Sequence, residues 1–123
     1  MKKIAALFFS FALISVFILS GCGANNKVSD GVNKMLDTTG QLSKAIDRGD
    51  QAKAKEIGPK LEDQWSSFED EVKKENKSLY NKVEKYLDPT IAGTEASPLD
   101  KQVLSSLNNK LTNALKELAS KTK

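Results

Sequence analysis

Histidine is absent from this chain of 123 residues, and cysteine occurs once, at Cys22. Without histidine the chain lacks the commonest general base of enzymes and the commonest protein ligand of transition metals. One cysteine excludes both an internal disulfide and a zinc site built from several thiolates. No phosphate-binding glycine loop, nucleophile elbow or dinucleotide fingerprint occurs either. We therefore predict that the protein is not an enzyme.

The chain also lacks a large excess of charge of one sign. It has 19 basic and 16 acidic residues, a formal net charge of +3, and Arg48 is its single arginine. Lys2 and Lys3 lie in the first 21 residues, so the rest of the chain carries 17 basic and 16 acidic side chains, or +1. Recognition of nucleic acid needs a concentrated basic field. This balance therefore argues against a nucleic-acid partner.

The amino-terminal segment has the three parts of an export signal. Met1-Lys2-Lys3 is positively charged, and residues 4–19 are apolar apart from two serines. A spanning helix needs about twenty apolar residues, so this stretch is short for a membrane anchor and typical of a signal peptide. The following Leu19-Ser20-Gly21-Cys22 resembles the lipobox of bacterial lipoproteins.

The lipobox resemblance implies cleavage between Gly21 and Cys22 and attachment of diacylglycerol, with acyl chains such as palmitate, to the Cys22 sulfur. Two acyl chains bury enough methylenes for stable anchoring. We expect a signal peptide over residues 1–21 and the lipidated cysteine with a flexible tether over residues 22–27. The protein is then anchored to the cell membrane on its extracytoplasmic face. A signal peptide without lipid and an uncleaved anchor helix are the alternatives.

Residues 28–123 are expected to form one helical domain. At about 100° per residue, the apolar side chains of four segments each gather on one face, as in helices that pack together. The segments are residues 28–47, 51–75, 79–87 and 99–119. Four helices with short connections predict an all-α, antiparallel up-and-down four-helix bundle whose third helix is short or kinked. A three-helix bundle with a loose third segment is the alternative.

Local signals refine these boundaries. Gly49 and Asp50 fit the end of one helix and the N-cap of the next. Ser78 and Ser97 are the expected caps of the later helices, with Pro98 in the first helical position after the second cap. Proline removes a backbone donor and crowds the preceding turn, so a kink or short break is expected at two further prolines. These are Pro59 and Pro89, and the expected core anchors are Trp65 and Phe68.

An acidic cluster extends from residue 62 to residue 75. Paired carboxylates can bind a hard cation such as calcium or ferric iron. Glu62 and Glu69 lie at the border of the apolar stripe, where they could meet a carboxylate or tyrosine of a neighbouring helix. They are therefore the candidate metal ligands. The other interpretation is a solvated face on which acids and lysines pair at i,i+4 spacing.

A longer series of features extends from Ala45 to Leu118. It includes the Gly49-Asp50 turn, the stretch from Trp65 to Lys73, the Leu79-Tyr80 and Val83-Glu84 pairs, and a final row of apolar residues at helical spacing. The series resembles the extracytoplasmic helical domain of bacterial iron permeases and the imelysin-like iron-uptake lipoproteins. This resemblance implies iron binding or delivery beside a membrane permease. The imelysin-like proteins carry a histidine-containing motif, so their metal residues cannot be transferred to this chain.

Two functions follow from the sequence. The first is a non-enzymatic binding module, anchored by lipid outside the membrane, with a protein of the cell envelope as its partner and no cofactor beyond the lipid. The alternative is an accessory lipoprotein of an iron-uptake system that binds a hard cation through carboxylates. A partner-binding bundle predicts an apolar patch left exposed on the surface. A cation carrier predicts three or more oxygen ligands that converge between helices.

Overall fold

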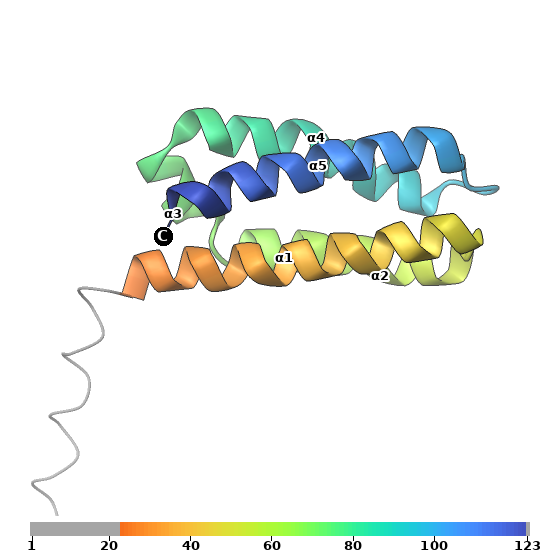
Figure 1. The fold of residues 1–123 in the computed structure, drawn as a ribbon, viewed down its shortest axis with the longest axis horizontal. Coiled ribbons are helices and arrows are strands. Elements are labelled where there is room, and N and C mark those ends of the chain that lie inside the picture. Colours follow the sequence, from red (N-terminus) through yellow and green to blue (C-terminus); the bar gives the residue numbers. More distant parts are fainter. Residues whose placement is uncertain (1–22, 123) are drawn as a thin grey trace, which may run out of the picture.

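The computed structural model describes residues 23–122, and this part of the chain is helical throughout apart from short connections (Figure 1). The predicted all-α class is confirmed for these residues. The helices are α1 (Gly23–Arg48), α2 (Gln51–Ser66), α3 (Glu69–Glu75), α4 (Lys77–Glu95) and α5 (Lys101–Lys121). The expected signal peptide, its cleavage site and Cys22 lie outside the described residues.

The four longer helices surround one core. Helix α1 packs against α2 and α5, and α4 packs against the same two helices, so each long helix has two neighbours. The colours of Figure 1 show that successive long helices run in opposite directions. The short α3 lies at the end where α1 begins and α5 finishes, and it packs mainly against α4.

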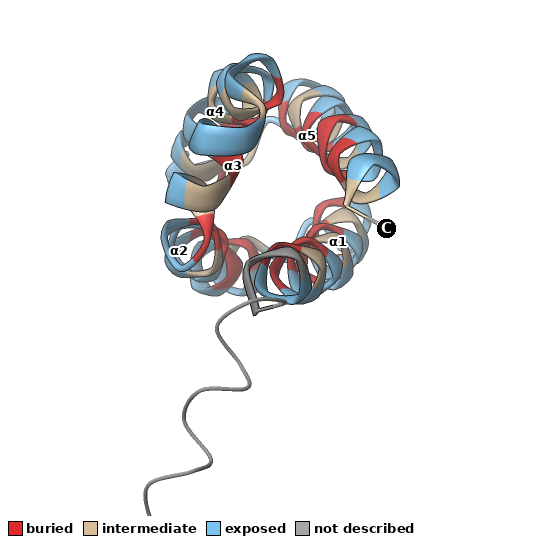
Figure 2. Ribbon diagram, turned by 90° about the vertical axis from the view of Figure 1, so that its left-hand side faces the viewer, coloured by how far each residue is buried: buried red, intermediate tan, exposed pale blue. Residues whose placement is uncertain are grey.

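The buried face of every helix points to the centre of this arrangement (Figure 2). The apolar periodicity of the sequence produces this result, because residues three or four apart share a helix face. Trp65 and Phe68 are among the largest side chains of the core, with 1% and 0% of their surface exposed. The buried polar residues are Thr38, Thr39, Thr90, Thr94 and Asn108.

Side chains cap three of the helices at their amino ends. Asp50 accepts a hydrogen bond from the backbone nitrogen of Lys53, after Gly49 has turned the chain with a φ of 66°. Asn76 caps α4, and Asp100 caps α5. The cap expected at Asp50 is present. Asn76 and Asp100 take the places of the expected caps Ser78 and Ser97.

The number of helices differs from the expected four, because the segment 51–75 is divided into α2 and α3. The hydroxyls of Ser66 and Ser67 donate to the carbonyl oxygens of Glu62 and Gln64, at 2.6 and 2.7 Å. Such local bonds compete with the helical pattern of the backbone. The apolar stripe continues across the break, so its periodicity alone did not reveal it.

Neither proline breaks its helix, because α2 continues through Pro59 and α4 through Pro89. A residue before proline is disfavoured in a helix partly by its Cβ. Gly58 has none, and it lies against Thr94 of α4, whose Oγ1 would be 2.3 Å from an added Cβ. Helix α4 extends to Glu95 and exceeds the expected third segment of residues 79–87 at both ends.

The first helix begins earlier than expected. Helix α1 starts at Gly23, so residues that we expected to belong to a flexible tether are helical. Lys27 lies in this turn of α1, and its Nζ is 3.1 Å from Glu71 Oε1 of α3. The contact joins the start of the domain to α3. None of the helices in residues 23–122 has a segment long and apolar enough to cross a membrane.

Candidate functional site

The break between α2 and α3 builds a cluster of three aromatic rings. Trp65 and Phe68 meet edge to face, with ring centroids 5.2 Å apart and an interplanar angle of 81°. Tyr80 of α4 stacks on Trp65 with centroids 5.8 Å apart. Since Phe68 immediately precedes α3, packing of its ring fixes where the first turn of α3, and therefore Glu69, lies.

Two carboxylates border this aromatic cluster. The indole nitrogen of Trp65 donates a hydrogen bond to Oε1 of Glu84 on α4. Burial and the negative charge of Glu84, followed by that of Asp70, raise the pKa of the Glu69 carboxyl. Burial and the same carboxylates, Glu84 before Glu69, also raise the pKa of the Tyr80 phenol. Glu69, Glu84 and Tyr80 therefore form one acidic site at the junction of α2, α3 and α4.

The two carboxylates proposed from the sequence have different surroundings. Glu69 lies within electrostatic reach of Glu84 and Tyr80 of α4. Glu62 is exposed on α2, and its charge makes only a small contribution to the raised pKa of Glu69. Glu84 was missed, although its spacing of four from Tyr80 places it on the same face of a helix.

The site has the chemistry of a weak acidic pair rather than a complete metal cage. Like charges without a cation between them favour the protonated form of one partner. Glu69 and Glu84 take part in none of the ion pairs found within residues 26–122. Among the described residues no three histidine, cysteine, aspartate or glutamate side chains lie close enough to hold a metal ion. A cation here would need water molecules to complete its coordination.

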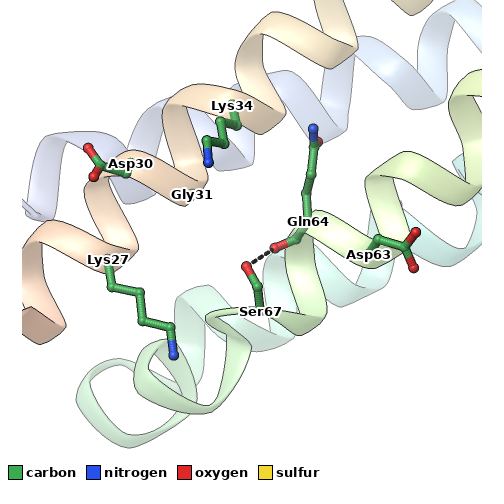
Figure 3. Close-up of a pocket in the computed structure, with 7 residues that line it drawn as sticks. All are labelled: Lys27, Asp30, Gly31, Lys34, Asp63, Gln64 and Ser67. Atoms are coloured by element: carbon green, nitrogen blue, oxygen red, sulfur yellow. Dashed lines mark hydrogen bonds between the residues drawn. The ribbon is translucent and has the colours of Figure 1, made fainter.

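A second feature is a hollow of about 420 Å³ between α1 and α2 (Figure 3). Its charged residues are of both signs, and in Figure 3 Asp63 of α2 points away from the α1 side chains. The ring of Phe68 fills the space beside Gly31, and Gln64 Oε1 is buried without a hydrogen-bond partner among the described residues. The lining is Lys27, Asp30, Gly31, Lys34, Asp63, Gln64 and Ser67.

The hollow does not extend the acidic site. Lys27 is paired with Glu71, and Ser67 donates its hydroxyl proton to Gln64 O. The two lysines and two aspartates of the lining sum to no net charge. Since neither a cation nor an anion is favoured by this balance, the junction of α2, α3 and α4 is the stronger candidate for function.

The described part of the chain is thus an all-helical domain with an acidic pair at the junction of α2, α3 and α4. It is similar to the iron uptake system component EfeM of Bacillus subtilis (strain 168), with 24% identity over 118 aligned residues. The match covers 82% of this chain and 31% of that relative, so the chain spans about a third of the relative's length. No family model and no solved structure matches the chain significantly.

Proposed function

We propose that the protein is a lipid-anchored accessory component of an iron-uptake system on the extracytoplasmic face of the cell membrane. The similarity to EfeM, which covers 82% of the chain, carries this proposal. The resemblance noted between Ala45 and Leu118 also implies a role in iron uptake. As a component of such a system, the protein would have another envelope protein as its partner.

The domain does not itself catalyse a reaction in this proposal. Enzymes need a positioned acid, base or nucleophile. The acidic pair of Glu69 and Glu84 has no histidine, thiol or serine arranged beside it among the described hydrogen bonds. We regard the four long helices as an antiparallel four-helix bundle into which α3 is inserted, a scaffold suited to holding side chains between helices.

The anchor is the part of the proposal that the amino-terminal sequence supports. A cationic start, an apolar run and Leu19-Ser20-Gly21-Cys22 occur in the order that lipoprotein export requires. We expect a Cys22→Ser variant to leave the membrane fraction, because the thioether anchor cannot form on a hydroxyl. Fractionation of cells that express each protein, followed by mass determination of the mature amino terminus, measures this. Membrane retention of the variant would contradict the anchor.

A hard cation is the ligand that the acidic pair suits best. Binding of Ca²⁺ or Fe³⁺ between Glu69 and Glu84 would replace repulsion between carboxylates with attraction, and Tyr80 could supply a further oxygen. We expect saturating Ca²⁺ or Fe³⁺ to raise the melting midpoint of the full chain in detergent, because a ligand that binds only the folded state stabilises it.

Variants of the two carboxylates test whether the cation that raises the melting midpoint binds between them. Glu69→Gln and Glu84→Gln should each remove most of the metal-dependent rise in midpoint, whereas Glu95→Gln, an exposed carboxylate near the end of α4, should leave it unchanged. A rise that survives both substitutions would place the cation elsewhere. No rise with either metal would exclude cation binding and leave the protein as a module that contacts a partner.

The module that contacts a partner is the second candidate function. Val103 of α5, 53% exposed, is the one large hydrophobic side chain exposed in residues 26–122. The exposed apolar patch predicted for a partner-binding bundle is therefore missing from this surface. A contact with an envelope partner would depend mainly on polar side chains.

A further inference from the structure

The groove between α1 and α5 has a lining unlike the rest of the surface. It encloses about 330 Å³, within the range of small-molecule sites, and no carboxylate lines it. The groove lies between two sets of residues, Leu36, Thr39, Gly40 and Ser43 of α1 and Asn108, Asn109, Thr112 and Lys116 of α5. Thr39 and Asn108 are buried, whereas Gly40, Asn109 and Lys116 are exposed, so the groove has a buried floor and an exposed rim.

The floor contains a hydrogen-bond acceptor without a donor. Asn108 is 2% exposed, and its Nδ2 donates to the carbonyl oxygen of Thr39 at 2.9 Å. This bond fixes the orientation of the amide, and Asn108 Oδ1 is then buried with no partner among the described residues. A buried polar atom left unpaired is unfavourable, so a ligand that donates a hydrogen bond to it is favoured.

The two threonine hydroxyls beside Asn108 are acceptors as well. Thr39 Oγ1 donates to Leu36 O at 3.0 Å, and Thr112 Oγ1 donates to Asn108 O at 2.8 Å. Each hydroxyl has one proton, and that proton is committed to its own helix, so only lone pairs remain for a ligand. The floor therefore requires hydrogen-bond donors from whatever occupies the groove.

The rim has the opposite character. Lys116 is exposed and makes no ion pair within the described residues, and Asn109 presents an exposed amide beside it. A cation at the rim without a carboxylate in the lining favours a negative group on the ligand. Gly40 leaves the α1 side of the groove open, since an added Cβ there would meet no atom within 4 Å.

We infer that the α1–α5 groove binds a polyol that carries one negative group, with its hydroxyls on Asn108 and the threonines and its anion at Lys116. Glycerol phosphates and acidic sugars share this chemistry. The inference does not depend on the proposed role in iron uptake, because the groove lies on a different pair of helices from the acidic site.

Titration of the full chain, labelled with ¹⁵N and held in detergent, tests the inference by NMR. Glycerol 3-phosphate and glucuronate are the probes, and glycerol and inorganic phosphate are the half-ligands. We expect saturable shifts in residues 36–43 and 108–116, including the side-chain amide of Asn108. Saturable binding of only one probe would support the inference and show whether the ligand is a glycerol phosphate or an acidic sugar. Absence of shifts with both, or equal affinity for inorganic phosphate, would overturn it.

Variants separate the groove from the fold. Gly40→Gln fills the open space and should weaken binding by about tenfold or more without lowering the melting midpoint. Ala92→Gln places the same side chain on the exposed surface of α4 and should change neither property. Asn108→Leu, which removes the acceptor, is the second blocking variant. Undiminished affinity in both Gly40→Gln and Asn108→Leu would overturn the inference.

Discussion

Phe68 packs its ring against the backbone of α1 at Gly31, and this contact joins the first helix to the break between α2 and α3. An added Cβ at Gly31 would lie 2.2 Å from Cδ1 and 2.4 Å from Cε1 of the Phe68 ring. Real Cβ atoms do not approach carbon so closely, and Phe68 is fully buried beside Trp65, so its ring has little room to move. Glycine is therefore required at this position by packing.

Two glycines of α1 give opposite predictions, because Gly31 is buried and Gly40 is exposed. Gly31→Ala should destabilise the fold by about 1–3 kcal/mol, the usual cost of overpacking a core. Gly40→Ala should stabilise it by about 0.5–1 kcal/mol, because alanine is the better helix former and nothing lies within 4 Å of its Cβ. Urea unfolding of both variants measures the difference. Equal effects of the two substitutions would show that the Phe68 contact does not constrain Gly31.

At the scale of the helix, caps decide where α4 and α5 begin. Asn76 accepts a hydrogen bond from the Leu79 nitrogen at 3.1 Å, and Asp100 accepts one from Val103 at the same distance. The serines expected to cap these helices occupy other positions. Ser78 lies within the first turn of α4, and Ser97 precedes α5 by several residues.

Substitution of each candidate cap distinguishes the two assignments. Asn76→Ala should lower the free energy of unfolding by about 1 kcal/mol, because the substitution removes a partner of the first turn. Ser78 is exposed and makes no side-chain hydrogen bond among those described. Ser78→Ala should therefore change the free energy of unfolding by less than about 0.5 kcal/mol. Thermal and urea unfolding both report the comparison. A larger loss for Ser78→Ala would restore the sequence-based assignment.

The sequence predicted the helical class and the buried faces well, because burial follows directly from apolar spacing. Trp65 and Phe68 lie in the core through that spacing alone. The break after Ser66 could not be predicted in this way, since Val72 continues the same stripe and remains buried beyond the break. Two serine-to-backbone bonds accompany the break, and apolar periodicity does not record such local bonds.

The acidic site, like the fold, could be predicted from the sequence only in part. The position of Glu69 at the border of its stripe indicated that it could reach a neighbouring helix. Its partner depends on how α4 lies against α2, and a single sequence contains no direct record of that contact. Glu84 is held there by the Trp65 indole, a hydrogen bond between residues 19 positions apart. Long-range pairs of this kind require the structure.

For the molecule as a whole, carboxylates act on stability in two directions. Lys53 and Lys60 hold the pKa of Glu56 below its ordinary value, and Lys27 does the same for Glu71. Those surface pairs stabilise the fold above the ordinary glutamate pKa and lose their effect as the pH falls through the lowered value. Exposed ion pairs are weak, so the contribution of each is small. Glu69 has a raised pKa and acts in the opposite sense.

The sign for Glu69 follows from proton linkage. A raised pKa in the folded state means that the folded chain holds this proton more tightly than the unfolded chain does. Its effect on stability is therefore most favourable at low pH and is lost as the pH rises from the ordinary glutamate pKa through the folded value. Above that window the charged Glu69 beside Glu84 opposes folding.

Glu69→Gln should consequently be more stable than the natural chain at pH 7, by up to about 1 kcal/mol for a partly exposed group. The two should converge below the ordinary glutamate pKa, because the natural side chain is then neutral as well. Urea unfolding across this pH range measures the difference, and Glu95→Gln provides an exposed carboxylate as the control. If the difference shrinks as the pH rises, Glu69 is stabilised in its charged form and the acidic pair with Glu84 does not exist.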